Sequence, residues 1–216
     1  MKRLVLIPAI LFLLASASYS QEAEGEFEYY KDRDVKTLLG KDRSGGKYGA
    51  ISLGYSGIDS RKTLVFGQKV TWLPVRSIGV GMGLNEFLSE YRHDAITDRD
   101  IYLMGGYGGM YIEAIVLPRF PIHASFPVLM GAGGISQMYS DEEFLVGNMF
   151  DEFQTFLVLE PGAEVELNLT RSMRLAAGIT YRFTTPFELK SSESYTTDIE
   201  SLRSLTFKLV FKFGRF

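Results

Sequence analysis

Hydrophobic and polar residues alternate with a period of two along the last thirteen residues of the chain. The apolar positions of this stretch are Leu205, Phe207, Leu209, Phe211 and Phe213. The intervening positions include Ser204, Thr206, Lys208, Lys212 and Gly214. Because successive side chains of a strand point to opposite faces, this pattern predicts a strand with one apolar and one polar face. Phe216 shares the parity of Lys208, so either the strand bulges at Gly214 or Phe213 is its last apolar-face residue.

Segments of the same kind recur along the chain after Gly46 and are separated by turn residues. The eight candidate strands are Tyr48–Ile58, Lys62–Leu73, Ser77–Leu84, Arg99–Leu117, Ile122–Gln137, Glu152–Thr170, Met173–Thr184 and Leu202–Phe216. Glycines interrupt the fourth and fifth candidates, at 104–110 and 131–134. Glycine weakens a strand unless curvature or a close approach requires it, and the closure of a small barrel supplies that requirement.

The connections between these strands alternate in length. The tight ones follow the second, fourth and sixth strands, at Pro74–Arg76, Pro118–Pro121 and Arg171–Ser172. The long polar ones follow the third, fifth and seventh strands, at Asn85–Asp98, Met138–Asp151 and Thr185–Ser201. Outer-membrane barrels have short periplasmic turns and long external loops. The sequence therefore predicts an all-β fold, an eight-stranded antiparallel up-and-down transmembrane β-barrel with both ends on the periplasmic side. The short connection around Asp59–Arg61 is the exception.

Charged residues collect on the polar parity of several predicted strands. The charges expected to face inward are Lys69, Glu113, Glu160, Glu164, Glu166, Arg174, Arg182, Lys208 and Lys212. A turn centred on Arg171 places Glu160 opposite Arg182 and Asn168 opposite Arg174. Eight strands enclose an interior only wide enough for side chains, and charges buried there must be paired. We expect a lumen charge network that fills the barrel, and an open diffusion pore is the less favoured alternative.

The N-terminal region is typical of an exported protein. Lys2 and Arg3 precede an apolar run of eleven residues, Leu4–Leu14, and small residues follow up to Ser20. We therefore expect a signal peptide at 1–20, a charged periplasmic lead-in at 21–46 and the barrel at 47–216. The lack of cysteine excludes lipobox lipidation, disulfides and thiolate metal sites. The net charge of −3, without a Lys/Arg cluster, gives no sign of nucleic-acid binding.

One pair of residues suggests catalysis. His123 and Ser125 share a strand face, and Glu113 on the neighbouring strand is a candidate to orient the imidazole, as in a base-activated hydroxyl. The pair resembles the His-x-Ser of a lipid A deacylase family of eight-stranded barrels. Phe126-Pro127 follows here, where that family has Ser-Asn-Ala-Gly, and the pair sits beside the periplasmic turn. We expect a structural histidine, with a membrane-embedded lipid A-type hydrolase as the alternative.

Other candidate sites have simpler interpretations. His93 stands with Glu90, Asp94 and Asp98 in a predicted loop, where solvated side chains are expected and no metal. The glycines of 79–83 precede no helix and no Lys-Ser/Thr, so they do not form a nucleotide-binding loop. Aromatic residues typical of a membrane-interface belt are Trp72, Tyr55 and Tyr181. No cofactor is expected.

The chain resembles small outer-membrane β-barrel proteins of the Bacteroidetes type over nearly all of 47–216. The segments that carry the resemblance are Gly49–Tyr55, Gly105–Glu113, Ser125–Gly134, Glu160–Asn168, Tyr181-Arg182 and Lys212–Phe216. These motifs are architectural, so the resemblance implies a fold and a location in the outer membrane and implies no particular activity.

The function expected from these observations is structural or surface-interacting, without catalysis. The expected partners are outer-membrane lipids, the barrel-insertion machinery and an unidentified extracellular or envelope protein at the long loops. A further alternative is a soluble periplasmic lipocalin-like binding barrel. It requires the opposite sidedness, with Glu160, Glu164, Arg174 and Lys208 facing water and Leu and Phe lining a cavity.

Overall fold

The computed structural model describes residues 45–58, 60–94, 98–139, 154–186, 189–190, 196–197 and 202–216. The predicted signal peptide, residues 21–44 of the lead-in and most of the loop expected at Met138–Asp151 lie outside these ranges. Within them, no helix has the length and apolar character that crossing a membrane requires.

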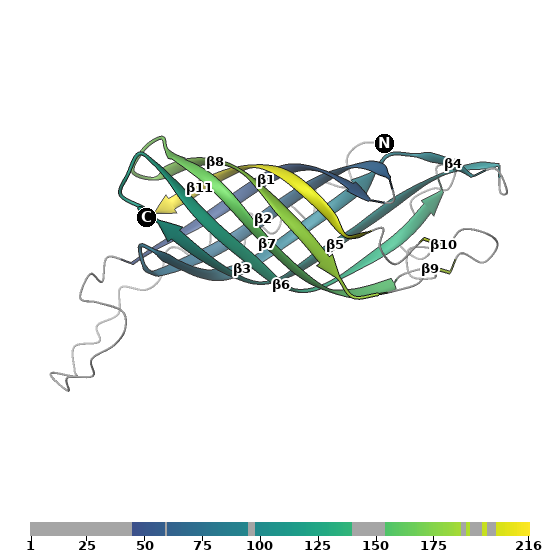
Figure 1. Ribbon diagram of the computed structural model, residues 1–216, viewed down its shortest axis with the longest axis horizontal. Helices are drawn as coiled ribbons and strands as arrows, with labels where there is room; N and C mark the ends of the chain where they lie inside the picture. The colour runs from purple at the N-terminus through teal and green to yellow at the C-terminus, as the bar shows by residue number, and fades with distance from the viewer. Residues whose placement is uncertain are drawn as a thin grey trace, which may run out of the picture. The chain divides into compact units, whose positions relative to one another are not determined.

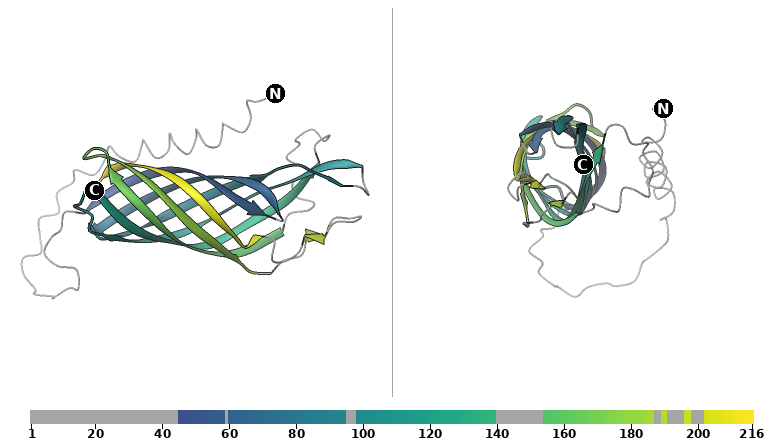
Figure 2. Two further views of the ribbon diagram at one scale, coloured as in Figure 1. Left: turned by 45° about the horizontal axis from the view of Figure 1, so that its top comes forward. Right: turned by 90° about the vertical axis from the view of Figure 1, so that its right-hand side faces the viewer.

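The described chain forms a closed antiparallel barrel, as predicted (Figures 1 and 2). Its eight strands are β1 (Gly46–Ile58), β2 (Arg61–Val75), β3 (Ile78–Ser89), β5 (Arg99–Val116), β6 (Ile122–Tyr139), β7 (Gln154–Asn168), β8 (Met173–Thr184) and β11 (Ser204–Arg215). Each of these eight strands pairs with the next one along the chain, and β1 pairs with β11 to close the ring. The short β4 (Arg92–Asp94) lies between β3 and β5 in the sequence and pairs with the start of β5, whereas β3 pairs directly with β5. Two short segments, β9 (Leu189–Lys190) and β10 (Thr196–Thr197), pair with each other in a separate sheet.

The two ends of the barrel differ. The turn end carries the short β2–β3, β5–β6 and β7–β8 connections, the start of β1 and the end of β11. At the opposite, loop end, β4 pairs with the first residues of β5 and prolongs the wall beyond its neighbours (Figure 1).

The prediction of a loop at Asn85–Asp98 is wrong over much of that range. β3 continues to Ser89, and Asn85, Phe87 and Ser89 are buried inside the barrel. His93, expected in that loop, lies on β4 opposite Asp100. Polar residues suggested a loop, but a barrel with a polar interior accepts polar side chains within its strands, so polarity does not mark a strand end here.

The sidedness of the wall is apolar outside and polar inside. Every second residue of β11 from Leu205 to Phe213 is exposed, whereas Lys208 and Lys212 are buried. Glu160 and Glu164 are also buried. This arrangement contradicts the lipocalin-like alternative, which needs these charges in water and the apolar residues inside.

Inward-facing glycines make room for aromatic rings in the lumen. A Cβ at Gly83 would lie 2.8 Å from the Tyr111 ring, and one at Gly105 would lie 2.6 Å from the Phe87 ring. The glycines of β3, β5 and β6 therefore meet the predicted requirement for a close approach. The rings join an apolar cluster in the half of the lumen nearest the loop end. Its members are Ile58, Val65, Phe87, Leu103, Tyr107, Tyr111, Leu129, Ile135, Phe156, Val158 and Leu202.

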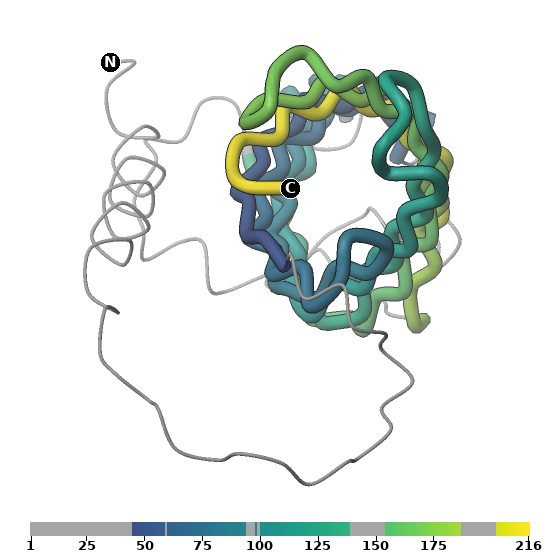
Figure 3. Tube along the Cα trace, turned by 90° about the vertical axis from the view of Figure 1, so that its left-hand side faces the viewer, coloured from purple at the N-terminus to yellow at the C-terminus, as the bar shows by residue number. Residues whose placement is uncertain are grey.

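The chain end turns into the barrel at the turn end (Figure 3). Gly214 has φ +157°, and a Cβ there would lie 2.2 Å from the Lys47 carbonyl oxygen, so only glycine fits. The Phe216 ring packs 5.3 Å from the Tyr48 ring and lies 3.9 Å from the Arg174 guanidinium carbon. Phe213 is therefore the last residue of β11 on the apolar outer face.

We predict that Gly133→Ala destabilises the barrel. The added methyl would lie 2.5 Å from the Gly106 carbonyl oxygen and 2.9 Å from the Phe156 ring. Overpacking of this kind lowers the free energy of unfolding by about 1–3 kcal/mol. Urea titration of protein folded in detergent measures this free energy. The matched control is Gly57→Ala, whose methyl would meet only the Arg61 carbonyl oxygen at 3.9 Å. Equal stability of the two variants would show that the lumen has spare room at this level.

Candidate functional site

The lumen holds a dense group of ionisable side chains. The structure buries the following charged residues inside the barrel, each at most 8% exposed: Lys69, Glu113, Glu160, Glu164, Glu166, Arg174, Arg182, Lys208 and Lys212. They come from five strands, β2, β5, β7, β8 and β11. They share the inner face because each occupies the inward parity of its strand.

Glu113 on β5 is one centre of this group. Its carboxylate accepts hydrogen bonds from the Tyr48 hydroxyl, from Lys69 Nζ at 3.1 Å and from Lys212 Nζ at 2.7 Å. The carboxylate is fully buried, so these donors replace the water that it loses on folding. Lys69 Nζ also lies 4.6 Å from the centre of the Tyr111 ring, which adds a cation–π contact.

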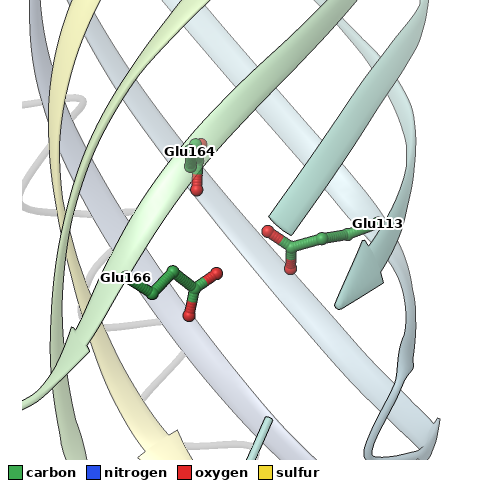
Figure 4. Close-up of side chains that lie close together, drawn as sticks. All are labelled: Glu113, Glu164 and Glu166. Atoms are coloured by element: carbon green, nitrogen blue, oxygen red, sulfur yellow. The ribbon is translucent and has the colours of Figure 1, made fainter. Parts of the chain in front are cut away.

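Lys212 joins Glu113 to the two inward glutamates of β7. Its Nζ lies 2.7 Å from Glu113 Oε1, 2.9 Å from Glu164 Oε2 and 2.5 Å from Glu166 Oε1. The carboxylates of these glutamates turn toward a common space (Figure 4). The Lys212 ammonium donates hydrogen bonds to Glu113 and Glu166 and forms an ion pair with Glu164. We call Lys212 and these glutamates the Lys212 cluster.

The same carboxylates have the spacing of a possible metal site, since one oxygen from each lies within 4.8 Å of the others. The Lys212 ammonium, however, is within 2.9 Å of every one of them. A cation bound among them would have to displace a buried ammonium that already satisfies the same oxygens. The geometry therefore favours a lysine-centred ion cluster, and we assign no metal to it.

A second centre lies nearer the loop end. Glu160 on β7 accepts hydrogen bonds from Lys208 Nζ and from the Tyr107 hydroxyl. Arg182 donates from Nε to the Leu202 carbonyl oxygen at 2.9 Å and from Nη2 to Ser204 Oγ at 2.7 Å. The β7–β8 pairing places Asn168 opposite Arg174, as predicted. The hydrogen-bonding partners of Glu160, by contrast, come from β11 and β5, the second strands to either side of β7.

The third centre lies at the turn end. Glu166 Oε2 is 3.1 Å from His123 Nε2 and 3.3 Å from Arg174 Nη1. The other imidazole nitrogen, Nδ1, lies 3.2 Å from the Phe120 carbonyl oxygen. Both nitrogens of His123 are thus held by groups of the barrel itself, as expected of a structural histidine.

The contacts of His123 and Ser125 differ from those of the hydrolase alternative, which paired them with Glu113. Ser125 Oγ donates to Glu164 at 3.3 Å, and the carboxylate beside His123 is that of Glu166. The Ser125 side chain is also fully buried, out of reach of a substrate. The hydrolase alternative was wrong in its choice of carboxylate. It took Glu113 from β5, but β6 has two neighbouring strands, and the carboxylates that contact His123 and Ser125 come from the other one, β7.

Sequence reasoning missed several members of the lumen. Tyr48 and Tyr107 donate to the central glutamates, and Arg61 is buried and donates to the Ile101 carbonyl oxygen at 3.2 Å. The signal available in the sequence was the two-residue period of a strand. Tyr48 lies two residues from the inward Ala50, and Arg61 lies two residues from the inward Thr63, so both share the inner face. The sequence places Arg61 in the connection after the first strand. In the structure that connection is shorter than expected, and Arg61 is the first residue of β2.

Free space around the described charged groups is uneven: a hollow of about 710 Å³ at the turn end borders Arg174 and Phe216, whereas the space deeper in the lumen is small. A hollow of about 20 Å³ lies beside Lys69, Tyr111 and Lys208. A volume of that size holds about one water molecule. Beyond it, toward the loop end, the apolar cluster of aromatic and aliphatic side chains fills the interior. The charged centres and this cluster together form a lumen plug.

No family model and no curated protein matches the chain. Solved structures do match. The neisserial surface protein A is 11% identical, with 79% of this chain and 96% of that chain covered and a TM-score of 0.53. The chain has the fold of a small outer-membrane β-barrel. A major outer membrane protein from Thermus thermophilus is 10% identical, with 78% and 98% coverage and a TM-score of 0.52. Likeness at these identities shows the fold alone, so membership of a Bacteroidetes-type family stays a prediction.

We predict that Lys212→Met strongly destabilises the barrel. The substitution keeps most of the side-chain volume and leaves the carboxylates of Glu113, Glu164 and Glu166 without their shared donor. Removing one partner of a buried ion cluster costs about 3–5 kcal/mol. Urea unfolding in detergent micelles measures the loss.

The control for this variant is Lys62→Met. Lys62 is exposed and lies 3.7 Å from the exposed Glu90, and such surface pairs contribute at most about 1 kcal/mol. Adding Glu166→Gln to Lys212→Met should recover part of the lost stability, because it removes one uncompensated charge. If Lys212→Met and Lys62→Met are equally stable, the cluster does not hold the barrel together.

Proposed function

We propose that this protein is a non-enzymatic outer-membrane barrel whose rigid, filled body holds a surface-exposed loop end. The observation that carries the proposal is the combination of an apolar outer wall with a lumen occupied by the Lys212 cluster and the apolar cluster. An outer wall of Leu and Phe suits lipid chains, and a filled interior suits a structural body. In this proposal the turn end faces the periplasm, after export by the signal peptide and insertion by the barrel-assembly machinery.

A role as an open pore fits the interior poorly. A channel through the barrel would have to break the contacts of Lys212 with its carboxylates and also displace Phe87, Tyr107 and Phe156. Buried charges that lose their partners carry a large desolvation penalty. Passive diffusion is therefore not part of the proposed function.

The loop end offers the surface on which a partner would act. There β4 and the start of β5 form an extension, on which the Tyr91 and Tyr102 rings meet edge to face with centres 5.1 Å apart. Tyr91 is 64% exposed, and His93 Nδ1 lies 3.2 Å from Asp100 Oδ1 beside it. Tyrosine is enriched at protein interfaces, and loops held by a rigid scaffold are common binding sites. An extracellular or envelope protein is the proposed class of partner.

Fractionation tests the location. We predict that the full-length protein is recovered in the outer-membrane fraction of a Gram-negative host. It should migrate faster on a gel when unheated than after boiling, because the closed barrel stays compact in detergent. A detergent-free soluble monomer would contradict the proposal.

Planar-bilayer recording tests the filled lumen. We predict that the reconstituted protein gives no steady ion conductance above that of the bare bilayer, because the lumen plug blocks the path. A general porin reconstituted in the same way serves as the positive control. Steady single-channel steps from the wild-type protein, absent from a mock preparation, would show that the plug opens and would replace the structural role with a channel.

A further inference from the structure

The outer wall at the turn end carries an arrangement that the fold itself does not require. The β1–β11 pairing puts Lys47 directly opposite Arg215, and both side chains are exposed. Like charges opposite each other in an antiparallel ladder are destabilising. On the other side of β1, Lys47 pairs with Trp72, which is 62% exposed. Two cations and an indole thus form a row across β2, β1 and β11.

A third cation continues this row. The last β8–β11 pair joins Phe213 to Met173, and the Gly214 amide then donates to the Ser172 carbonyl oxygen at 2.9 Å. Arg215 follows that pair by two residues on β11, and the exposed Arg171 precedes it by two residues in the β7–β8 turn. Arg171 and Arg215 also border one hollow at the mouth of the barrel. We call Lys47, Arg171, Arg215 and Trp72 the rim row.

The charge at the two ends of the barrel is unequal. At the turn end, every described ionisable side chain that is not buried is a cation, and these are Lys47, Arg76, Arg119, Arg171 and Arg215. At the loop end the described, unburied charges are of both signs and include Glu86, Glu90, Asp98, Asp100, Lys62, Arg92 and Arg203. The protein as a whole has a net charge of −3, so the cationic rim is a local feature.

The rim row stands at the border of the apolar wall. One step closer to the middle of the barrel, the exposed outer residues are Val70, Phe213 and Met173. Indole rings collect where lipid tails meet headgroups, and long cationic side chains extend from such borders to the headgroups. In a barrel that spans a bilayer with this apolar wall, lipid phosphates would lie at this height.

We propose that the rim row binds the phosphate of an anionic glycerophospholipid in the periplasmic leaflet. This proposal rests on the proposed function, in which the barrel spans the outer membrane with its turn end at the periplasm. A lipid fits better than a free anion because these exposed cations border the apolar outer wall, the surface that acyl chains would cover. Guanidinium groups also match phosphate oxygens in a two-point geometry. The bound phosphate would offset the repulsion between Lys47 and Arg215.

Trp72 makes the proposal directly measurable. It is the single tryptophan of the chain and pairs with Lys47 within the row. The full-length protein is reconstituted in phosphatidylcholine bilayers that contain a fixed fraction of brominated phosphatidylglycerol or of brominated phosphatidylcholine. Bromine quenches indole fluorescence on contact, so the ratio of quenching reports which headgroup occupies the site.

We expect the wild-type protein to bind phosphatidylglycerol in preference to phosphatidylcholine by a factor on the order of five for each cation that contacts the phosphate. The triple variant Lys47→Gln, Arg171→Gln and Arg215→Gln should lower the ratio of quenching by the two lipids to about one, because the preference comes from the charges that it removes. The matched control removes three cations at the loop end, by Lys62→Gln, Arg92→Gln and Arg203→Gln, and should keep the preference. Equal quenching by the two lipids in the wild-type protein would overturn the proposal, as would the same loss in the control variant.

A competition with inorganic phosphate and the total quenching by the two lipids distinguish a lipid site from a free-anion site and from a barrel outside the bilayer. Inorganic phosphate is compared with sodium chloride at equal ionic strength, and a loss of preference with phosphate alone would show a free-anion site instead of a lipid site. Absence of quenching by both brominated lipids would show that Trp72 does not reach a bilayer. That result removes the membrane-spanning barrel itself, whereas equal quenching by both removes only the lipid preference.

Discussion

The interior of this barrel depends on one ammonium group held by three carboxylates. Lys212 lies on β11, whereas Glu113 lies on β5 and Glu164 and Glu166 lie on β7. In the sheet β11 pairs only with β1 and β8, so the contact with Glu113 crosses the lumen to the opposite strand, and those with Glu164 and Glu166 pass over β8. The pairs Lys69–Glu113 and Lys208–Glu160 likewise join strands that do not pair with each other, each across one intervening strand. The backbone ladder closes the ring, and these ion pairs connect it across the middle.

The outer wall cannot fix the structure in this way. Lipid chains contact Leu, Val and Phe alike, so a slip of one strand by two residues would expose an equally apolar surface. The same slip would move a lumen charge away from its partners and leave it buried and unpaired, which is strongly unfavourable. In the Lys212 cluster the penalty is shared by residues far apart in the sequence. Register is therefore specified most strongly where the charges meet, although buried ion pairs add little net stability by themselves.

Alternation and loop lengths were enough to predict the fold. Strict alternation in β8 gave its bounds, Met173–Thr184, as the structure has them. Partners inside the lumen were harder to predict because register describes only neighbouring strands. Glu160 lies at the level of Arg182 on the next strand, yet it bonds to Lys208 and Tyr107 from strands that do not pair with β7. In a narrow lumen a long side chain reaches the second strand along the wall as easily as the neighbouring one. Asn85 was placed in a loop for a related reason, since a polar interior hides the usual contrast between strand and loop.

A filled lumen moves any contact with other molecules to the ends and the outer wall. The described side chains of the two ends differ. At the turn end Phe216 folds inward onto Tyr48 and Arg174, which covers part of the mouth and leaves Arg215 and Lys47 on the outside. Those cations oppose each other on adjacent strands, an arrangement that is costly in water and favourable beside anionic headgroups. The loop end carries both signs of charge and an aromatic pair on a projecting extension, which suits a protein surface better than a lipid one. The body between the two ends is held by ion pairs that tie strands without shared backbone hydrogen bonds, so the differing side chains of the two ends are carried on one closed wall.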